Sequence, residues 1–289
     1  MNKQGLVIAL AVGGVVGVVF GIFPNLDLQL SALFYDPTTG YFPAQASLPA
    51  RIGRAAAMWM VWVLALPALV SLAVKIVLPR HQMLIPCRAT LFLVLSILLV
   101  ALVPNAGFKA YWGRPRPITT TEFGGPWQFK AWWNPTGQCP RNCSFYSGEA
   151  TTAFWTYAVA ALAPPGWRPL AYLGATVFGL ATGVLRMAFG GHYFTDVIFG
   201  GVMAFLIVWL MHGAYYRWPR TKQTDEEIDA HLTRWLLSAF QGVSSTFLKY
   251  RETSVPRLHS NKPVSDSFAA SGLRGGDASI AKVESSDLT

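Results

Sequence analysis

Three short polar clusters contain the residue types that could hold an anion, and the first reads Lys109-Ala-Tyr-Trp-Gly-Arg-Pro-Arg116-Pro117. A turn that contains Pro and Gly keeps two cations near one another. Arg116 offers a planar fork of donors and Lys109 a point charge, which together suit a phosphate group. Taken alone, the cluster is more typical of an anchor for anionic lipid, so its interpretation depends on the other two.

The second cluster is Ser144-Phe-Tyr-Ser147-Gly148-Glu149, directly before an apolar run that predicts a helix. Free backbone N–H groups at a helix N-terminus attract anions, and a flexible Gly148 lets an anion approach. The Ser147 hydroxyl adds one more donor. Taken alone, the cluster is more typical of a simple N-cap, with Ser147 as the cap and Glu149 as a favourable early acid.

The third cluster is Arg186, His192 and Asp196. If a helix begins near His192, this residue and Asp196 lie four apart on one face, where a carboxylate can orient an imidazole and stabilise its cation. A lone histidine is usually structural. His192 follows two glycines and precedes a rare carboxylate, so it is a candidate for catalysis.

The composition around these clusters indicates a membrane protein. Of 289 residues, 53% are hydrophobic and 13% are charged, which favours a bilayer environment. Ionisable groups near membrane spans are costly and suggest function. The net charge of +9 also suits plain attraction to anionic headgroups. Residues 1–212 hold 13 Lys and Arg but only five carboxylates, at Asp27, Asp36, Glu122, Glu149 and Asp196.

Six hydrophobic runs are long enough, or nearly so, to cross a core of about 30 Å. The first resembles a signal peptide because Lys3 precedes it, but it lacks a convincing cleavage site, so we expect a span. The sequence therefore predicts an all-α domain over 1–212 with six membrane helices. The runs cover about 5–23, 55–74, 89–104, 149–164, 169–185 and 196–212.

An even number of spans puts both ends of the domain on one side of the membrane. The basic residues that follow the last span favour the cytoplasm for that side. Counting all loops, however, gives eight cations on each side. Equal counts do not decide the orientation in the membrane unless some of the outer cations have a function of their own.

The outer loops are long and distinctive. Residues 24–54 suggest a short amphipathic helix at the interface. Residues 105–146 are rich in Gly, Pro and Trp, and the tryptophans favour a belt at headgroup depth over substrate contact. In the same loop, Cys139 and Cys143 lie four residues apart and could pair if the loop is outside the cytoplasm. Cys87 is expected to be a small buried residue.

The segment after the last span changes character. Apolar residues recur at near-helical spacing over 225–250, with acids at the front, which predicts an amphipathic cytoplasmic helix within 213–251. From 252 to 289 the sequence is polar and lacks periodicity, so we expect a disordered tail.

Together, the three clusters resemble the signature of the type 2 phosphatidic acid phosphatase family, which also includes vanadium haloperoxidases. That signature is Lys-x6-Arg-Pro, Pro-Ser-Gly-His and Ser-Arg-x5-His-x3-Asp, and the resemblance covers 109–196 and the six-span layout. Two departures stand out. Leu185 replaces a serine, and Glu149 replaces the histidine that in the family acts as the acid for the leaving alcohol.

This resemblance implies a two-step phosphoryl transfer in which His192, oriented by Asp196, becomes a phosphohistidine that water hydrolyses. Lys109, Arg116, Arg186, Ser147 and the Gly148 amide would neutralise the phosphate, without a metal or cofactor. If Lys109, Arg116 and Arg186 bind phosphate and are left out of the charge count, five cations remain on the outer side against eight on the inner side, which favours the same orientation. The expected location is the bacterial inner membrane, with a periplasmic site and both termini cytoplasmic.

The resemblance implies a phosphorylated lipid as substrate, the membrane as environment and no nucleic-acid partner. Similarity to bacterial lipid A phosphatases favours removal of the 1- or 4'-phosphate. Undecaprenyl diphosphate and phosphatidylglycerophosphate are alternatives, as are a lipid phosphotransferase and a non-catalytic lipid-binding or transport protein. For Glu149, the roles of acid, positioning group and substitute suited to a better leaving group all stay open.

Overall fold

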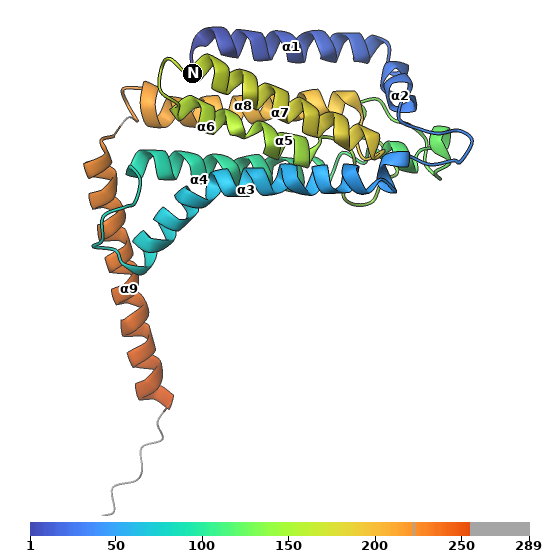
Figure 1. Cartoon of the computed structure of the whole chain (residues 1–289). Helices are drawn as coiled ribbons and strands as arrows, with labels where there is room; N and C mark the ends of the chain where they lie inside the picture. The colour runs from blue at the N-terminus through green and yellow to red at the C-terminus, as the bar shows by residue number, and fades with distance from the viewer. Residues whose placement is uncertain (222, 255–289) are drawn as a thin grey trace, which may run out of the picture. The chain divides into compact units, whose positions relative to one another are not determined.

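The computed structural model describes residues 1–221 and 223–254, with side chains described as far as residue 241. Every named element within these residues is helical, which confirms the predicted all-α fold (Figure 1). One compact unit spans Met1–Gln241 and contains the bundle; the described part of the second unit is the last stretch of α9. The helices are α1 (Lys3–Ile22), α2 (Asn25–Ala32), α3 (Leu48–Val77), α4 (Cys87–Leu102), α5 (Gly148–Phe154), α6 (Thr156–Leu162), α7 (Arg168–Ala188), α8 (Phe194–His212) and α9 (Asp225–Ser254).

Five helices in the described part of the chain are long and apolar enough to cross a membrane. They are α1, α3, α4 with its π-helical extension Val103–Phe108, α7, and α8 with its extension Gly213–Arg217. The fourth expected span, 149–164, is instead divided into α5 and α6, of seven residues each. Because α3, α4, α7 and α8 all contact this pair, it lies inside the bundle and does not need a long lipid-facing surface.

The break between α5 and α6 falls at Trp155, which is fully buried. The hydroxyls of Thr151, Thr152 and Thr156 donate to carbonyls three or four residues earlier, a pattern that bends helices. The Trp155 indole N–H donates to Ser96 Oγ of α4 at 2.8 Å. A buried indole with a hydrogen-bond partner thus fixes the bend, which hydropathy alone does not reveal.

Small residues let the inner helices approach closely, as is common between membrane helices. A Cβ atom on Gly179 of α7 would collide with the Phe154 ring of α5. A Cβ on Gly183 would likewise collide with Val197 of α8. Close contact of α7 with α5 and α8 places the C-terminal end of α7 beside the N-terminal ends of the other two helices.

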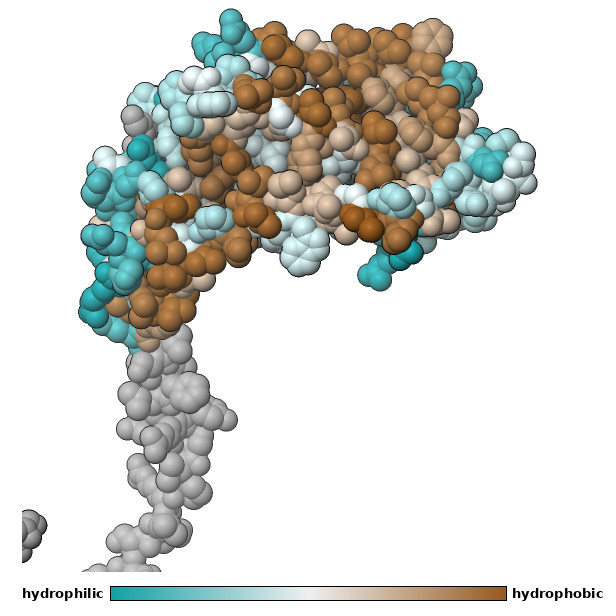
Figure 2. Space-filling view, in the orientation of Figure 1, coloured by the Kyte–Doolittle hydropathy of each residue, from teal (hydrophilic) through white to brown (hydrophobic). Residues whose placement is uncertain are grey.

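The outer surface of the bundle is apolar. Figure 2 shows hydrophobic residues over the middle of the helices and hydrophilic residues gathered toward the ends of the bundle on the face drawn. Helix α1 packs mainly on α8, and most of its residues are not buried by other parts of the protein. Such a surface is stable in hydrocarbon and would be costly in water. The chain is therefore a multi-pass membrane protein.

Opposite ends of the bundle carry different contacts. At one end, Arg217 donates to the backbone oxygen of Met1, so the start of the chain lies beside the end of the last span. At that end too, Lys75 Nζ lies 2.6 Å from Asp229 of α9. The starts of α3, α5 and α8, the end of α7 and the loop from 109 to 147 meet at the other end, which contains the polar clusters.

Several predicted boundaries need correction. Helix α3 begins at Leu48 rather than near 55, so its first turns carry charged residues. The interfacial helix expected in 24–54 is only α2, and its Asp27 is buried. Helix α9 runs from Asp225 to Ser254, slightly past the predicted end at 251. Nearly all of the tail predicted over 252–289 lies outside the described residues.

Candidate active site

His192 lies in the short connection between α7 and α8, two residues before α8 begins. The expectation that it shares a helical face with Asp196 is therefore wrong, because only Asp196 is helical. The His192 side chain is buried, and its Nδ1 lies 2.8 Å from the Ser144 carbonyl oxygen but 3.6 Å from Asp196 Oδ2. If Nδ1 donates to that carbonyl, Nε2 keeps its lone pair for attack.

The path of this connection depends on Gly190, whose φ is +64°. A side chain at this position would also meet the Phe42 ring, since a Cβ would lie 2.6 Å from it. Gly190 therefore supplies a left-handed turn that few other residues adopt without strain. This turn ends α7 and directs the chain into His192.

Asp196 is fully buried, and its carboxylate accepts several hydrogen bonds. Arg114 Nη1 donates to Oδ1 at 2.6 Å, and both the Ser144 hydroxyl and the Tyr193 backbone N–H donate to Oδ2. Ser144 therefore touches both members of the pair, through its carbonyl to His192 and through its hydroxyl to Asp196. The structure adds Ser144 as the link between them.

Arg114 is the centre of a buried ionic network that the sequence analysis did not identify. Its side chain is fully buried, and it bonds Asp196, Asp27 of α2 at 2.7 Å and the Thr195 hydroxyl at 2.9 Å. Its Nε also donates to the Lys130 carbonyl. Buried charges persist only when paired and hydrogen-bonded, so the rarity of Asp27 was the available signal for this network.

Two of the predicted phosphate ligands lie against glycines. A Cβ on Gly148 would lie 2.9 Å from Lys109 Nζ, and a Cβ on Gly191 would lie 2.6 Å from Arg186 Nη2. The glycines thus leave room for one cation at the start of α5 and another beside His192. Arg186 Nε is buried and has no hydrogen-bond partner among the described residues.

Ser147 is the N-cap of α5, as the simpler interpretation of its cluster predicted. Its Oγ accepts from the Ala150 N–H at 3.4 Å, and its own backbone N–H donates to the Asp196 carbonyl at 3.1 Å. The hydroxyl proton is not used in these bonds. Ser147 can therefore cap the helix and still donate to an anion.

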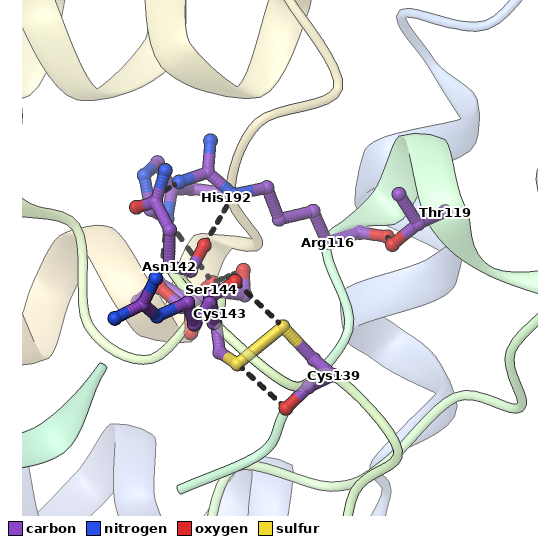
Figure 3. Close-up of a disulfide and its surroundings, with 9 residues drawn as sticks. Arg116, Thr119, Cys139, Asn142, Cys143, Ser144 and His192 are labelled. Atoms are coloured by element: carbon purple, nitrogen blue, oxygen red, sulfur yellow. Dashed lines mark hydrogen bonds and ion pairs between the residues drawn. A yellow bond between two sulfur atoms is a disulfide. The ribbon is translucent and has the colours of Figure 1, made fainter. Parts of the chain in front are cut away.

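Arg116 is oriented by the loop that contains Cys139 and Cys143. These cysteines form a disulfide, and Figure 3 shows it beside Arg116, Asn142 and His192. Arg116 Nε donates to the Asn142 carbonyl at 3.0 Å, and Nη2 donates to Asn142 Oδ1 at 2.7 Å. The disulfide thus closes a small ring around the residue that holds the guanidinium.

The tryptophans of the long loop mostly pack inside it. Trp112 donates to the Trp132 carbonyl at 2.7 Å and stacks on Phe145. Trp132 donates to a carbonyl of α1 and packs on Phe199. The interpretation of these two residues as a headgroup belt is therefore incomplete, since they brace the loop against the bundle, whereas Trp133 is exposed.

Glu149 is held by Arg54, a residue of α3 that the sequence analysis counted only as an outer cation. Arg54 Nε donates to Glu149 Oε2 at 2.8 Å and Nη2 to Oε1 at 2.5 Å. Glu149 Oε1 also lies 3.5 Å from Arg186 Nε. A bidentate guanidinium favours the ionised carboxylate. Arg54 was not predicted as a site residue because the hydropathy of α3 rises only near residue 55, whereas the helix begins at Leu48.

Burial and charge set the protonation of two groups outside the spans. Burial lowers the pKa of His192 to about 4, so the ring is neutral near pH 7. Burial, assisted by Arg116 and Arg186, lowers the pKa of Lys109 to about 8. The site thus combines a neutral imidazole with three neighbouring cations, which suits an anion that is attacked by nitrogen.

Comparison with known proteins agrees with this geometry. The family model of the PAP2 superfamily matches residues 89–220. A lipid A 4'-phosphatase of Francisella tularensis subsp. novicida is 31% identical over 220 residues, which cover 75% of this chain and 98% of that protein. A lipid A 4'-phosphatase of Rhizobium leguminosarum is 31% identical over 202 residues, which cover 65% and 87%. No solved structure matches.

The chain belongs to the PAP2 superfamily, as its three motifs predicted. Together with the activity named for its relatives, this membership makes the chain a hydrolase of the phosphatase class.

Replacing Arg114 should destabilise the fold far more than replacing its neighbour in the same loop. Arg114→Gln leaves two buried carboxylates without their cation, which typically costs about 3–5 kcal/mol. Arg116→Gln removes a half-buried guanidinium and should lower activity with little effect on folding. Thermal unfolding in detergent checks this, and equal melting temperatures for the two variants would contradict it.

Breaking the disulfide should lower activity. In Cys143→Ser the ring around Asn142 is released, so Arg116 and the adjacent Ser144 lose their fixed positions, and we expect about a tenfold lower rate because small misplacements are costly. Dithiothreitol should reproduce the loss in the unmodified protein. Cys87→Ser, which changes the free cysteine of α4, is the control, and full activity of Cys143→Ser would refute the proposed role.

Proposed function

We propose that this protein hydrolyses a phosphate monoester of a membrane lipid. The substrate is lipid A, and the group removed is its 1- or 4'-phosphate. The observation that carries the proposal is a buried neutral His192 beside three cations. The names of two relatives favour the 4'-phosphate. The apolar surface of the bundle supports a substrate that arrives from the bilayer.

In the first step, His192 Nε2 attacks phosphorus as the bond from phosphorus to the leaving lipid oxygen breaks. Lys109, Arg116 and Arg186 neutralise the equatorial oxygens, and the Ser147 hydroxyl and Gly148 amide donate to them. The Ser144 carbonyl holds the Nδ1 proton, so the ring keeps the tautomer that attack requires. The leaving oxygen takes a proton from water.

In the second step, water attacks the phosphohistidine, the P–N bond breaks and inorganic phosphate leaves. Asp196 stabilises the positive charge that the imidazole carries in the intermediate, at the observed separation of 3.6 Å. The cations repeat their role in this transition state, so the residues of the chain account for charge neutralisation in both steps without a metal ion.

Glu149 acts in this proposal as a positioning group. Its carboxylate already accepts two hydrogen bonds from Arg54 and lies near Arg186. A carboxylate in such a pair is poorly suited to donate a proton to the leaving oxygen. It fixes instead where the two guanidinium groups lie.

We further propose that the site faces the periplasm and that the chain lies in the inner membrane, with its N-terminus in the cytoplasm. Disulfides persist in oxidising compartments, and the Cys139–Cys143 bond is part of the site loop. When Lys109, Arg116 and Arg186 are assigned to the phosphate site, five outer cations remain against eight inner ones, which supports the same orientation.

The direct test is phosphate release from purified lipid A in detergent with EDTA, with mass spectrometry to identify the position removed. His192→Asn should lower the rate by at least about 10³-fold, because no nucleophile remains. Protein quenched in denaturant at alkaline pH, where the P–N bond of phosphohistidine is stable, should carry phosphate on His192. Full activity of His192→Asn would refute the mechanism, and transfer of labelled phosphate to a second lipid would identify a phosphotransferase.

The pH profile of kcat/KM should show two limbs. Attack needs a neutral His192, so activity falls as pH drops through about 4. Phosphate binding needs a charged Lys109, so activity falls as pH rises through about 8. Since kcat/KM reports the free enzyme, Lys109→Arg should move the alkaline limb upward. Lys130→Arg is the control, and an unmoved limb in Lys109→Arg would exclude this assignment.

Glu149→Gln should lower kcat and raise KM together, by about tenfold in kcat/KM, because Arg54 and Arg186 lose a shared anchor. Arg54→Gln should have a similar effect, and the double variant should be little worse than either single variant. A loss confined to kcat in Glu149→Gln, with Arg54→Gln unaffected, would instead identify Glu149 as the proton donor.

A further inference from the structure

A pocket of about 460 Å³ lies beside the active site, and Glu149 forms part of its wall. Its walls come from the start of α3, the turn before it and the end of α7. None of its cations belongs to the three family motifs. The residues that matter for its chemistry are Gln45, Arg51, Arg54, Met58, Glu149 and Phe189.

The charge in this pocket is unbalanced. Arg51 and Arg54 lie three residues apart on α3, so they share a face of the helix. Glu149 neutralises Arg54 through two hydrogen bonds. Arg51 is exposed. Its backbone N–H donates to the Ser47 carbonyl, but its guanidinium forms no hydrogen bond or ion pair with any residue in the described part of the chain. One full positive charge is therefore left in the pocket.

The position of these arginines in α3 adds to the imbalance. The helix begins at Leu48 and has no acidic residue in its first turn. Cations are disfavoured at a helix N-terminus because the helix dipole is positive there. The free Arg51 in the first turn, together with this dipole, makes the pocket attractive to an anion.

The pocket also connects to the reacting centre. Glu149 lines it and lies 3.5 Å from Arg186, whose guanidinium packs on Gly191, next to His192. Phe189, which lines the pocket, precedes His192 by three residues. The adjacent lipid-facing surface of α3 is apolar, with Leu48, Ile52 and Trp59 exposed. A lipid headgroup at the site can therefore extend into the pocket while its chains stay on α3.

We infer that this pocket binds a second anionic group of the same substrate, at Arg51, while the phosphate to be removed lies at His192. The inference rests on the proposed lipid phosphatase function and makes it more specific. The substrate class it selects is a lipid with a large polar head that carries two separated anionic groups, because a single small phosphate headgroup would leave Arg51 unused. Arg51 is then a specificity residue.

The test compares two glucosamine disaccharide lipids that differ only in carrying one or two phosphates, each in neutral detergent. The unmodified protein should show about a tenfold lower KM for the bisphosphorylated lipid. Arg51→Gln should abolish this difference while leaving kcat for the monophosphorylated lipid unchanged. Arg141→Gln, which removes an exposed outer cation away from the pocket, should keep the difference. A difference that survives in Arg51→Gln, or that disappears in Arg141→Gln, would overturn the inference.

A neighbouring anionic lipid is the other source of such a group, and adding phosphatidylglycerol to the micelles separates the two. If a neighbour fills the pocket, phosphatidylglycerol should lower KM for the monophosphorylated lipid in the unmodified protein but not in Arg51→Gln, which would overturn binding of the substrate's own second group. If phosphatidylglycerol has no such effect, the tenfold preference belongs to the substrate.

Binding by the His192→Asn variant tests the pocket independently of catalysis. This variant should bind the bisphosphorylated lipid about tenfold more tightly than the monophosphorylated lipid, and adding Arg51→Gln should remove the preference. If the unmodified protein releases no phosphate but this preference holds, the proposed function fails while the pocket assignment stands. Equal binding of both lipids would refute the pocket assignment even if the protein is an active phosphatase.

Discussion

The buried guanidinium of Arg114 is the interaction on which the rest of the site depends. It joins α2 through Asp27, the start of α8 through Asp196 and the long loop through the Lys130 carbonyl. These segments are far apart in the sequence, and hydrophobic packing alone does not fix their register. Losing one partner of a buried charge is strongly destabilising, so the network holds Asp196, and with it the start of α8 beside His192, against the loop.

Two other cations of the site are much less fully paired than Arg114. Arg114 is paired on several sides, whereas Lys109 and Arg186 lie against glycines. Arg186 Nε has no hydrogen-bond partner among the described residues. Arg114 is thus the cation that holds the fold, whereas Lys109 and Arg186 are among the cations that we propose for phosphate binding. Glu149 and Arg54 are an intermediate case. They pair with each other, but their ion pair is only partly buried and lines the pocket.

The fold class, the membrane character and the family followed from the sequence because hydropathy and motif spacing are local properties. His192, Asp196 and the cations were predicted in the same way, from the spacing of local motifs. Arg54, Arg114 and Ser144 were not assigned, since their roles depend on contacts between segments 50 to 95 residues apart. The split of α5 from α6 was also missed. An interior helix is covered by other helices, so its hydropathy carries no information about its continuity.

The glycines at 148 and 191 have a consequence for sequence variation. Each is fixed by a side chain that lies on it, because Lys109 covers one and Arg186 covers the other. Their mutational tolerance is therefore conditional: a larger residue becomes acceptable only if the cation above it is lost or moves. A substitution at either glycine should therefore be coupled to the position of the cation above it, although the residues of each pair are separated in one case by 39 positions and in the other by five.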